Sequence, residues 1–460
     1  MLALFAVIAL AAPRASANGA FPAVSQLLGD PSDPTHLVLR SNFGLLVTHD
    51  RGESWDLVCE AGLGYQNVEP AIALLNDGTT IVALPNGIAH GSTECAFGPA
   101  SGIADYVADV ARVPGAQGQA VAVSVELDAG VSQVWRSIDG GQSWDTWGSA
   151  LNGLNATTLD VAGDPQGTLY VSGVSQADTV SGVLARSSDG GQSWMRWTVP
   201  GANKLSAPYI AALAADDADT LYVRMSGSPG KLLVSHDGGA NLSAVLDFSG
   251  PLDGFALSPD GRFALASGRA DGVWRARTSD LAFERVSCTK LRCLSWTSAG
   301  LFACADEFQA GFLVGESVDE GLSFEPRLHM SCVRGPLACS SDSSVARACD
   351  AGWPTLAEVL GSDCANATFI PRTDCSDGGT SGAGATSGVS DGATSGVSDG
   401  ATSGVSDGGA SAKAERQAAG GCSLSPPKAA RSAWPLTLLA LLTLLCGSAR
   451  RRSSAGKRSA

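Results

Sequence analysis

Residues 48–55 read THDRGESW, residues 137–144 read SIDGGQSW and residues 187–194 read SSDGGQSW, and each octet follows a short apolar run. The shared pattern is Ser/Thr-x-Asp-x-Gly-x-Ser-Trp, which suits the corner of a β-hairpin. The aspartate can accept hydrogen bonds from backbone N–H groups two or more residues further on. The glycine can take a positive φ without a Cβ clash, and the tryptophan begins the next strand and packs inward. We therefore expect a structural role for Asp50, Gly52, Trp55, Asp139, Gly141, Trp144, Asp189, Gly191 and Trp194.

Weaker copies of the octet recur along the chain. SHDGGANL at residues 235–242 keeps Asp237 but ends in leucine, and SVDEGLSF at residues 317–324 keeps Asp319 and ends in phenylalanine. Two further copies, ending at Phe97 and Phe283, rest on spacing more than on sequence. The final hydrophobic residues of successive copies lie 41 to 50 residues apart, which is close to the period of a four-stranded propeller blade.

The repeat predicts an all-β fold, a seven-bladed β-propeller over residues 18–330, with six or eight blades as the alternatives. Three apolar runs precede each corner or end at it, and one follows it, which gives four strands per repeat. Glycine accounts for 56 of the 460 residues and charged residues for only 16%, and amphipathic helix patterns are absent from this region. Because a blade buries its apolar face only against its neighbours, we expect the core to lie between blades.

The octet resembles the Asp box, or BNR repeat, of sialidase-like β-propellers. In these families the box lies on the periphery of the blade, so the resemblance implies a structural role for its aspartates here. The residues that a sialidase needs are not apparent. The family's Arg-Ile-Pro segment near the start is missing, and Phe21-Pro22 stands where it would be expected.

Two aspartates are the candidates for any catalytic role. Asp-box propellers include enzymes that cut plant glucans with two opposed aspartates, and Asp109 and Asp160 occupy innermost-strand positions that could face a central channel. The glycine-flanked aspartate motif of that family is not visible, and an aspartate on an inner strand often serves as a backbone partner. The sequence therefore favours a non-catalytic binding or scaffold protein for a protein or glycan ligand, with a glycoside hydrolase as the alternative.

Net charge and the resemblance to other propellers narrow the range of expected partners. The formal net charge is −15, whereas nucleic-acid binding needs a basic surface, so a nucleic-acid partner is not expected. Similar propellers include photosystem II assembly factors and sortilin-like receptors, which bind peptides or proteins through one face. They share only the box and the period with this chain, so they indicate the fold and not the ligand. No cofactor and no metal are predicted.

Both ends of the chain predict export to the cell envelope. Residues 1–17 resemble a signal peptide with the cleavage motif Ala15-Ser16-Ala17. Residues 422–460 combine Cys422, an apolar segment and a basic tail, an order that resembles the MYXO-CTERM type of C-terminal sorting signal. The resemblance implies processing near Cys422 by sorting machinery and retention at the cell surface; a plain single-pass membrane anchor is the alternative.

A low-complexity segment separates the predicted propeller from this tail. The sequence GATSGVSD occurs three times in tandem between residues 384 and 407. Segments rich in glycine, serine and threonine bury too little apolar surface to offset chain entropy. We therefore predict a disordered linker over residues 376–421 that holds the propeller away from the membrane.

Cysteines are concentrated in the exported part of the chain, which predicts disulfides. Cys59 and Cys95 lie near the corners of adjacent blades and are expected to pair, and Cys293 and Cys304 flank two neighbouring strands. The others are left for residues 331–375, where the pairing stays open: Cys288, Cys332, Cys339, Cys349, Cys364 and Cys375. A zinc cluster is the alternative for these thiols, but no C-x-x-C pair is present.

Residues 331–375 are predicted to form a small cysteine-rich cap and not an eighth blade. Pro354 suits the first position of a helix and Gly361 the position after its end, which predicts a helix of about two turns. No strand exchange between the first and last blades is evident in the sequence. We therefore expect the cap to cover the junction between these two blades.

Overall fold

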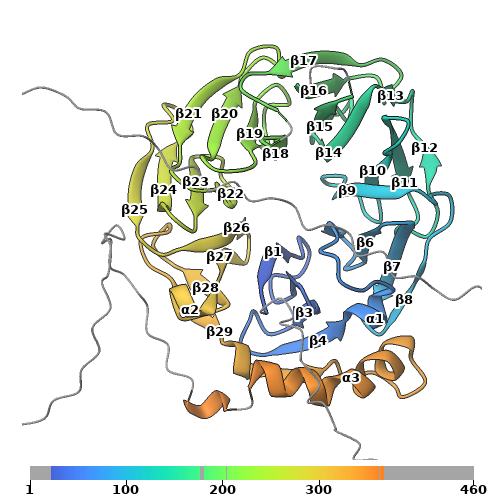
Figure 1. The fold of residues 1–460 in the computed structure, drawn as a ribbon, viewed down its shortest axis with the longest axis vertical. Helices are drawn as coiled ribbons and strands as arrows, with labels where there is room; N and C mark the ends of the chain where they lie inside the picture. The colour runs from blue at the N-terminus through green and yellow to red at the C-terminus, as the bar shows by residue number, and fades with distance from the viewer. Residues whose placement is uncertain (1–21, 177–180, 204, 362, 367–460) are drawn as a thin grey trace, which may run out of the picture. The chain divides into compact units, whose positions relative to one another are not determined.

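The computed structural model describes residues 22–176, 181–203, 205–361 and 363–366. They all belong to the first of the two units into which the chain divides, Met1–Ser381. In this unit, seven blades of antiparallel strands surround a central channel (Figure 1); five of the seven sheets have four strands and two have five. The prediction of an all-β seven-bladed propeller is confirmed.

Each blade is built from strands that follow one another in the sequence, from the channel outward. The first blade consists of β1 (Val24–Gly29), β2 (Leu37–Ser41), β3 (Gly44–Thr48) and β4 (Trp55–Cys59). The second consists of β5 (Ile72–Leu74), β6 (Thr80–Leu84), β7 (Gly87–Thr93) and β8 (Ala96–Pro99). The third consists of β9 (Tyr106–Arg112), β10 (Ala120–Glu126), β11 (Val131–Ser137), β12 (Asp145–Thr146) and β13 (Leu151–Asn152). In the third blade β12 and β13 both pair with β11, so its outer edge is a broken strand.

The remaining four blades are regular. The fourth blade consists of β14 (Leu154–Val161), β15 (Leu169–Ser175), β16 (Gly182–Ser187) and β17 (Met195–Val199), and the fifth of β18 (Pro208–Leu213), β19 (Leu221–Met225), β20 (Lys231–Ser235) and β21 (Ser243–Asp247). The sixth blade consists of β22 (Gly254–Leu257), β23 (Phe263–Gly268), β24 (Gly272–Arg277) and β25 (Glu284–Ser287). The seventh consists of β26 (Leu291–Thr297), β27 (Gly300–Ala305), β28 (Val314–Ser317) and β29 (Glu325–Leu328). Two short helices, α1 (Glu60–Leu63) and α2 (Glu307–Ala310), lie in loops.

The hydrophobic core lies between the blades, as the repeat predicts. Its buried residues form seven clusters, and each cluster contains residues of two neighbouring blades. The cluster between the second and third blades, for example, joins Ile81 and Ala83 to Val107 and Val110. Each blade therefore depends on its neighbours to bury its apolar faces.

The five octets with an aspartate form the same corner between the third and fourth strands of their blades. In the third blade the Ser137 hydroxyl donates to Asp139 Oδ1 at 2.8 Å and accepts from the Gly141 N–H at 2.9 Å. Asp139 Oδ1 also accepts from the Ser143 N–H at 3.0 Å. The same three contacts occur at the corners that contain Asp50, Asp189, Asp237 and Asp319.

The aromatic residues that end these octets do not all behave alike. Trp55 and Trp144 are buried, and each indole donates to the carbonyl oxygen of the glycine in its own corner. Trp194 is only half-buried, and its indole donates instead to Ser149 O at 3.1 Å. The loop that interrupts the outer strand of the third blade therefore occupies the edge of the fourth blade, where Ser149 also donates to Gly191 O at 2.7 Å.

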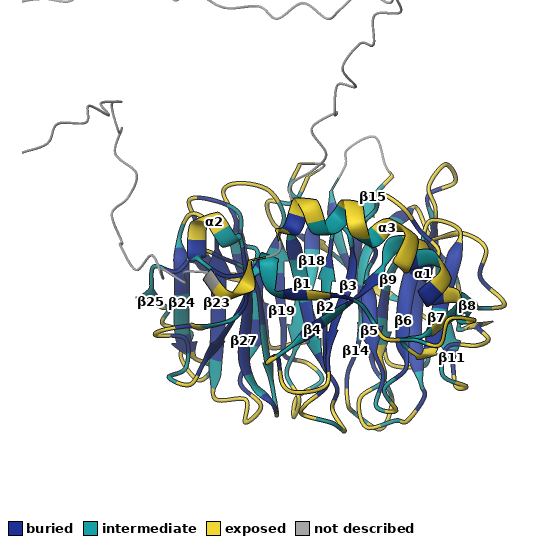
Figure 2. Cartoon of the chain, turned by 90° about the horizontal axis from the view of Figure 1, so that it is seen from below, coloured by how far each residue is buried: buried dark blue, intermediate teal, exposed yellow. Residues whose placement is uncertain are grey.

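The segment after the seventh blade closes the ring. It contains η1 (Met330–Cys332), β30 (Val333–Pro336), α3 (Ser344–Leu360) and η2 (Cys364–Asn366). β30 pairs in parallel with β4, the outer strand of the first blade. Figure 2 shows α3 in front of the ring with one face exposed. Leu360 packs in the cluster between the seventh and first blades, and Val345 packs in the cluster between the first and second.

Helix α3 corrects the predicted two-turn helix. It has 17 residues, and it begins at Ser344 because the Ser343 hydroxyl accepts a hydrogen bond from the Ala346 N–H at 3.0 Å. Pro354 therefore lies inside the helix and not at its first position, while Gly361 ends it with a φ of 85°. The N-cap serine was the stronger signal for the helix start.

The disulfides also correct a prediction. Cys59 and Cys95 do not pair with each other: Cys59 pairs with Cys349 on α3, and Cys95 pairs with Cys339 between β30 and α3. The cap lies along the outer strands of both blades, so Cys59 and Cys95 each lie beside a cysteine of the cap and not beside each other. The remaining described pairs are Cys293 with Cys304 and Cys332 with Cys364.

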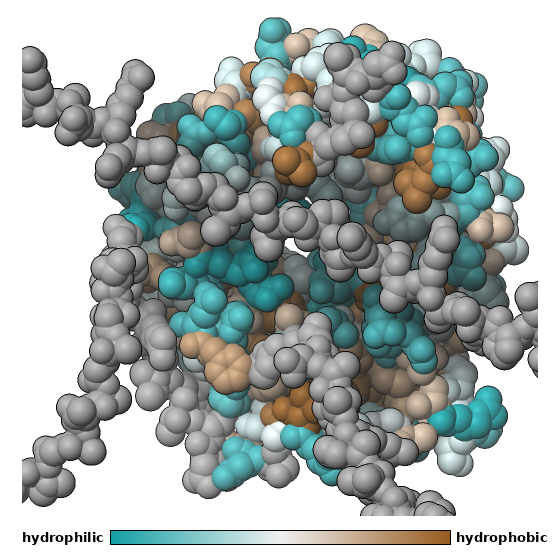
Figure 3. Space-filling model, in the orientation of Figure 1, coloured by the Kyte–Doolittle hydropathy of each residue, from teal (hydrophilic) through white to brown (hydrophobic). Residues whose placement is uncertain are grey.

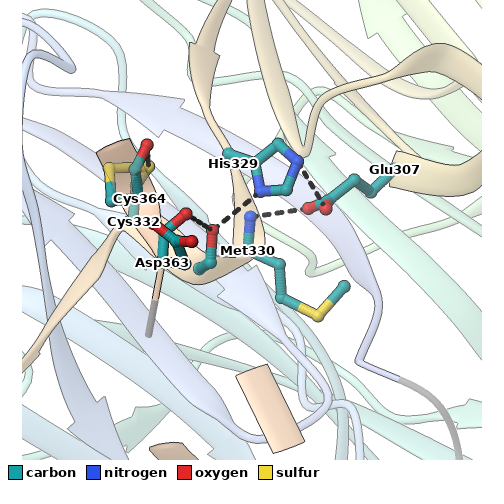
Figure 4. The surroundings of a disulfide bond; sticks show 7 residues. Glu307, His329, Met330, Cys332, Asp363 and Cys364 are labelled. Carbon is teal, nitrogen blue, oxygen red and sulfur yellow. Dashed lines mark hydrogen bonds and ion pairs between the residues drawn. A yellow bond between two sulfur atoms is a disulfide. The ribbon is translucent and has the colours of Figure 1, made fainter. Parts of the chain in front are cut away.

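Contacts at the start of the cap hold the chain as it leaves the seventh blade (Figure 4). Glu307 on α2 accepts from the Met330 N–H at 2.6 Å, and its other carboxylate oxygen lies 2.9 Å from His329 Nε2. The disulfide between Cys332 and Cys364 lies beside this contact. The start of the cap is therefore held both by Glu307 on α2 and by the disulfide between Cys332 and Cys364.

No helix among the described residues is long and apolar enough to cross a membrane. The predicted signal peptide, the linker, Cys422 and the apolar segment of the tail lie outside the described residues.

Candidate functional site

A cavity of about 620 Å³ lies in the central channel, where the inner strands of all seven blades meet. Small residues on these strands, such as Ala108, Ala156 and Ala211, leave the space open. Figure 3 shows hydrophilic residues around the opening at the centre of the ring. The charged and aromatic side chains in the wall are Arg40, Glu69, Tyr106, Asp109, Tyr209, Arg224, Asp253 and Phe255.

The inner strands reach the cavity through β-bulges. In five blades the register between the first and second strands skips one residue of the inner strand. Four of the residues skipped, Ser25, Ala108, Thr157 and Ala211, line the cavity. A bulge bends its strand and redirects a side chain, and bulges are common beside binding and active sites.

Arg40 and Arg224 carry the positive charge of the cavity. Arg40 donates to Pro70 O at 2.6 Å and to Ser25 Oγ at 3.0 Å, and Arg224 donates to Leu252 O at 3.3 Å. Neither guanidinium forms an ion pair with a carboxylate of the described residues. Burial lowers the pKa of both groups, but a guanidinium remains protonated in proteins. Each therefore keeps its charge and has N–H groups that no described side chain or carbonyl occupies.

Tyr209 and Tyr106 add aromatic surface to the wall. The guanidinium carbon of Arg224 lies 4.7 Å from the centre of the Tyr209 ring, which fixes the arginine over an aromatic face. Tyr106 is 42% exposed, a high value for a tyrosine on an inner strand. Aromatic faces beside charged donors suit ligands that combine apolar and polar groups.

The structure places Asp109 in the cavity wall and Asp160 outside it. Asp109 Oδ2 accepts from the Leu159 N–H of the next blade at 2.9 Å, and Oδ1 accepts from its neighbour Val110. Burial raises the pKa of Asp109 to about 7 and that of Asp160 to about 6. The two residues lie on β9 and β14, which are inner strands of adjacent blades. They do not oppose each other across the channel.

The other acidic residues of the wall are already engaged. Glu69 accepts a hydrogen bond from Ser25 Oγ at 3.1 Å. Asp253 accepts from Arg269 through both carboxylate oxygens, at 2.9 and 3.2 Å. Both carboxylates are therefore held in place by hydrogen bonds from neighbouring side chains.

The octet residues lie away from this cavity. Asp50, Asp139, Asp189, Asp237 and Asp319 are at the corners between third and fourth strands, and none of them lines the channel. Arg40 and Arg224 were missed in the sequence. Both take the fourth position of a second strand, in LVLRS and LYVRM, and an arginine that recurs in a buried apolar strand is the signal that could have identified them.

Comparisons with known proteins place the fold but not the function. No family model matches the chain, and no curated protein matches it. An ancestral GH74 enzyme is similar to it with a TM-score of 0.52 and 15% identity, over 66% of this chain and 46% of that one. The extracellular domain of a putative one-component system from B. thetaiotaomicron has a TM-score of 0.43 and 13% identity, over 62% and 37%. YCF48 bound to D1 peptide has a TM-score of 0.42 and 14% identity, over 61% and 88%.

The chain thus spans less than half the length of the GH74 enzyme. At such low identity the likeness shows the fold alone. The chain is an all-β seven-bladed propeller with structural neighbours among GH74 enzymes and other propellers.

Proposed function

We propose that this chain is a non-catalytic β-propeller, displayed at the cell surface, that binds a protein or glycan ligand in its central channel. The observation that carries the proposal is the pair of guanidinium groups, Arg40 and Arg224, in the wall of a polar cavity. A buried charge that forms no close ion pair is costly, although Glu69 and Asp253 attract these two groups from a distance. A ligand that brings carboxylate, hydroxyl or carbonyl oxygens to these N–H groups would recover part of that cost.

The wall supports binding more than catalysis. Asp109 links β9 to β14, much as Thr157 links β14 to the next blade by donating to Pro208 O at 2.7 Å. Side chains of this kind hold neighbouring inner strands together. Asp109 therefore has a structural task that accounts for its position, whereas the free N–H groups of the two arginines have none.

We further propose that the five corners are Asp boxes with a structural role. Each aspartate is saturated by the hydroxyl two residues before it and by groups four residues after it, as at Asp139. A carboxylate with its oxygens so occupied serves to fix the turn. The exported and surface-retained location rests on the predicted signal peptide and on the tail around Cys422.

A blocked channel tests the proposal. Ala108→Arg would place a long side chain in the cavity, and Ala104→Arg adds the same charge at an exposed position just before β9. Wild-type protein and both variants would be applied to a glycan array and to envelope fractions. We expect wild type and Ala104→Arg to retain a ligand that Ala108→Arg loses. Equal capture by all three, with both variants folded, would refute a channel site.

A glycoside hydrolase is the second candidate, favoured by one observation. Asp109 has a pKa raised to about 7 and lies in the cavity wall, and a carboxyl group of this kind can donate a proton at neutral pH. Hydrolysis of a glycan on a glycosidase panel, lost in Asp109→Asn, would establish this activity and overturn the non-catalytic assignment.

A further inference from the structure

Two histidines and a glutamate meet between the first and second blades, outside the channel. His36 precedes β2, His49 lies in the corner between β3 and β4, and Glu94 lies in the turn between β7 and β8. One ligand atom of each residue lies within 4.8 Å of the other two. Glu94 Oε1 is 3.0 Å from His36 Nε2 and 3.4 Å from His49 Nε2.

The orientation of His36 is fixed from its other nitrogen. Asp30 Oδ2 lies 3.2 Å from His36 Nδ1, and Asp30 is itself held by the Ser32 N–H at 2.8 Å and the Ser32 hydroxyl at 2.7 Å. A carboxylate acceptor at Nδ1 places the proton there, so the lone pair of a neutral imidazole lies on Nε2. In many metal sites a carboxylate orients the histidine in this way, by accepting the N–H of the ring nitrogen that does not bind the metal.

The lone pair of His36 then faces an oxygen of Glu94. The side chain of His36 is only 5% exposed, and its Nε2 atom makes no aligned hydrogen bond with any described residue, although Glu94 Oε1 is close. Two electron-rich atoms at 3.0 Å repel each other unless a cation lies between them. The cation is either a second proton on His36 or a metal ion.

We propose that His36, His49 and Glu94 bind a divalent transition-metal ion of the Zn²⁺ class, with Asp30 orienting His36. Two imidazoles and one carboxylate are a ligand set that Zn²⁺ takes in proteins, with water in the fourth position. Tetrahedral zinc with bonds of about 2.0–2.1 Å holds its ligand atoms about 3.4 Å apart. The distances from Glu94 Oε1, 3.0 and 3.4 Å, are near this value.

One side chain has to turn for the ion to bind. The rings of His36 and His49 are stacked, with centres 4.5 Å apart and planes 17° from parallel, so both lone pairs cannot point at one ion. His49 can turn because its side chain is 54% exposed and its contact with Glu94 Oε1, at 3.4 Å, is a long one. Glu94 is fixed by the adjacent disulfide between Cys95 and Cys339. The ion would thus join the first blade to the second beside the cap.

The test is titration of the full-length, untagged protein with Zn²⁺ after treatment with a chelator. We expect one Zn²⁺ per chain by calorimetry and a higher Tm in its presence, since an ion that binds only the folded state stabilises it. Co²⁺ in place of Zn²⁺ should give the visible absorption of a tetrahedral site. Absence of stoichiometric binding by either ion would overturn the proposal, and a protonated His36 would then be the explanation of the cluster.

The variants remove one ligand each without disturbing the core. His49→Ala changes an exposed side chain, and Glu94→Gln keeps the size of the group; each should weaken Zn²⁺ binding at least about tenfold. His236→Ala is the matched control, because His236 takes the same place in the corner of the fifth blade as His49 in the first. Binding that survives both ligand variants, or that His236→Ala removes, would overturn the assignment.

Discussion

The disulfide between Cys59 and Cys349 should hold the cap helix on the ring, and its removal has a calculable effect. Replacing both cysteines by alanine leaves the bridge from Cys95 to Cys339 in place. Removing this bridge opens a covalent loop that the two disulfides close together. The loop contains only the 36 residues from Cys59 to Cys95 and the 10 residues from Cys339 to Cys349. For a closed loop of about 46 residues, the loss of chain entropy corresponds to about 4 kcal/mol at 25 °C.

Measured effects of disulfides are typically about 2–4 kcal/mol, so we expect the free energy of unfolding to fall by about 3 kcal/mol. In a domain of about 345 residues that lowers Tm by about 4 °C. Circular dichroism gives the Tm, and hydrogen exchange of α3 shows whether the loss begins at the cap. The matched control is Cys293→Ala with Cys304→Ala, which opens a bridge inside one hairpin of the seventh blade. Unchanged exchange in α3 of the first variant would refute a role of the cap in closing the ring.

Three further perturbations follow from particular contacts. Burial raises the pKa of Asp109 in the folded protein to about 7 from 3.8, so the folded protein binds this proton more tightly than the unfolded chain does. The free energy of unfolding should therefore fall as pH rises from about 4 to about 7, and the Tm of Asp109→Asn should not show this dependence on pH. Gly102 has a φ of +105°, and a Cβ there would lie 2.0 Å from Trp144 O, so Gly102→Ala should lower Tm strongly, while Gly98→Ala, with nothing within 4 Å, should not. Hydrogen bonds from Ser193 lower the pKa of Asp189 to about 2, so stability should be lost as pH falls from about 4 to about 2, and Asp189→Ala should lower Tm at pH 7 and remove this acid dependence.

The blades were predictable because their corners are local. Each octet fixes its own turn through contacts within a few residues of one another, as between Ser137, Asp139 and Gly141. A signal of this kind is legible in a short stretch of sequence, and its recurrence sets the number of blades. Phe97 and Phe283 were found only by spacing, yet their segments form the outer edges of the second and sixth blades.

The cap and the cavity were less predictable because their contacts join distant parts of the chain. Cys59 and Cys349 are 290 residues apart, and sequence alone gave no means to choose Cys349 over Cys95. Arg40 and Arg224 meet only because the ring closes. His49 occupies the variable position of its octet, so its proximity to His36 and Glu94 has no local signature.

The central claim, that the channel binds a ligand through its arginines, is tested most directly by one affinity. Arg224→Gln removes the charge in the cavity wall, and Arg262→Gln removes one from an exposed side chain. A hydrogen bond to a charged group contributes about 1.5–3 kcal/mol, so Arg224→Gln should weaken binding of the captured ligand about 10- to 100-fold. Arg262→Gln should bind as wild type does. Equal affinity in all three proteins would contradict the account.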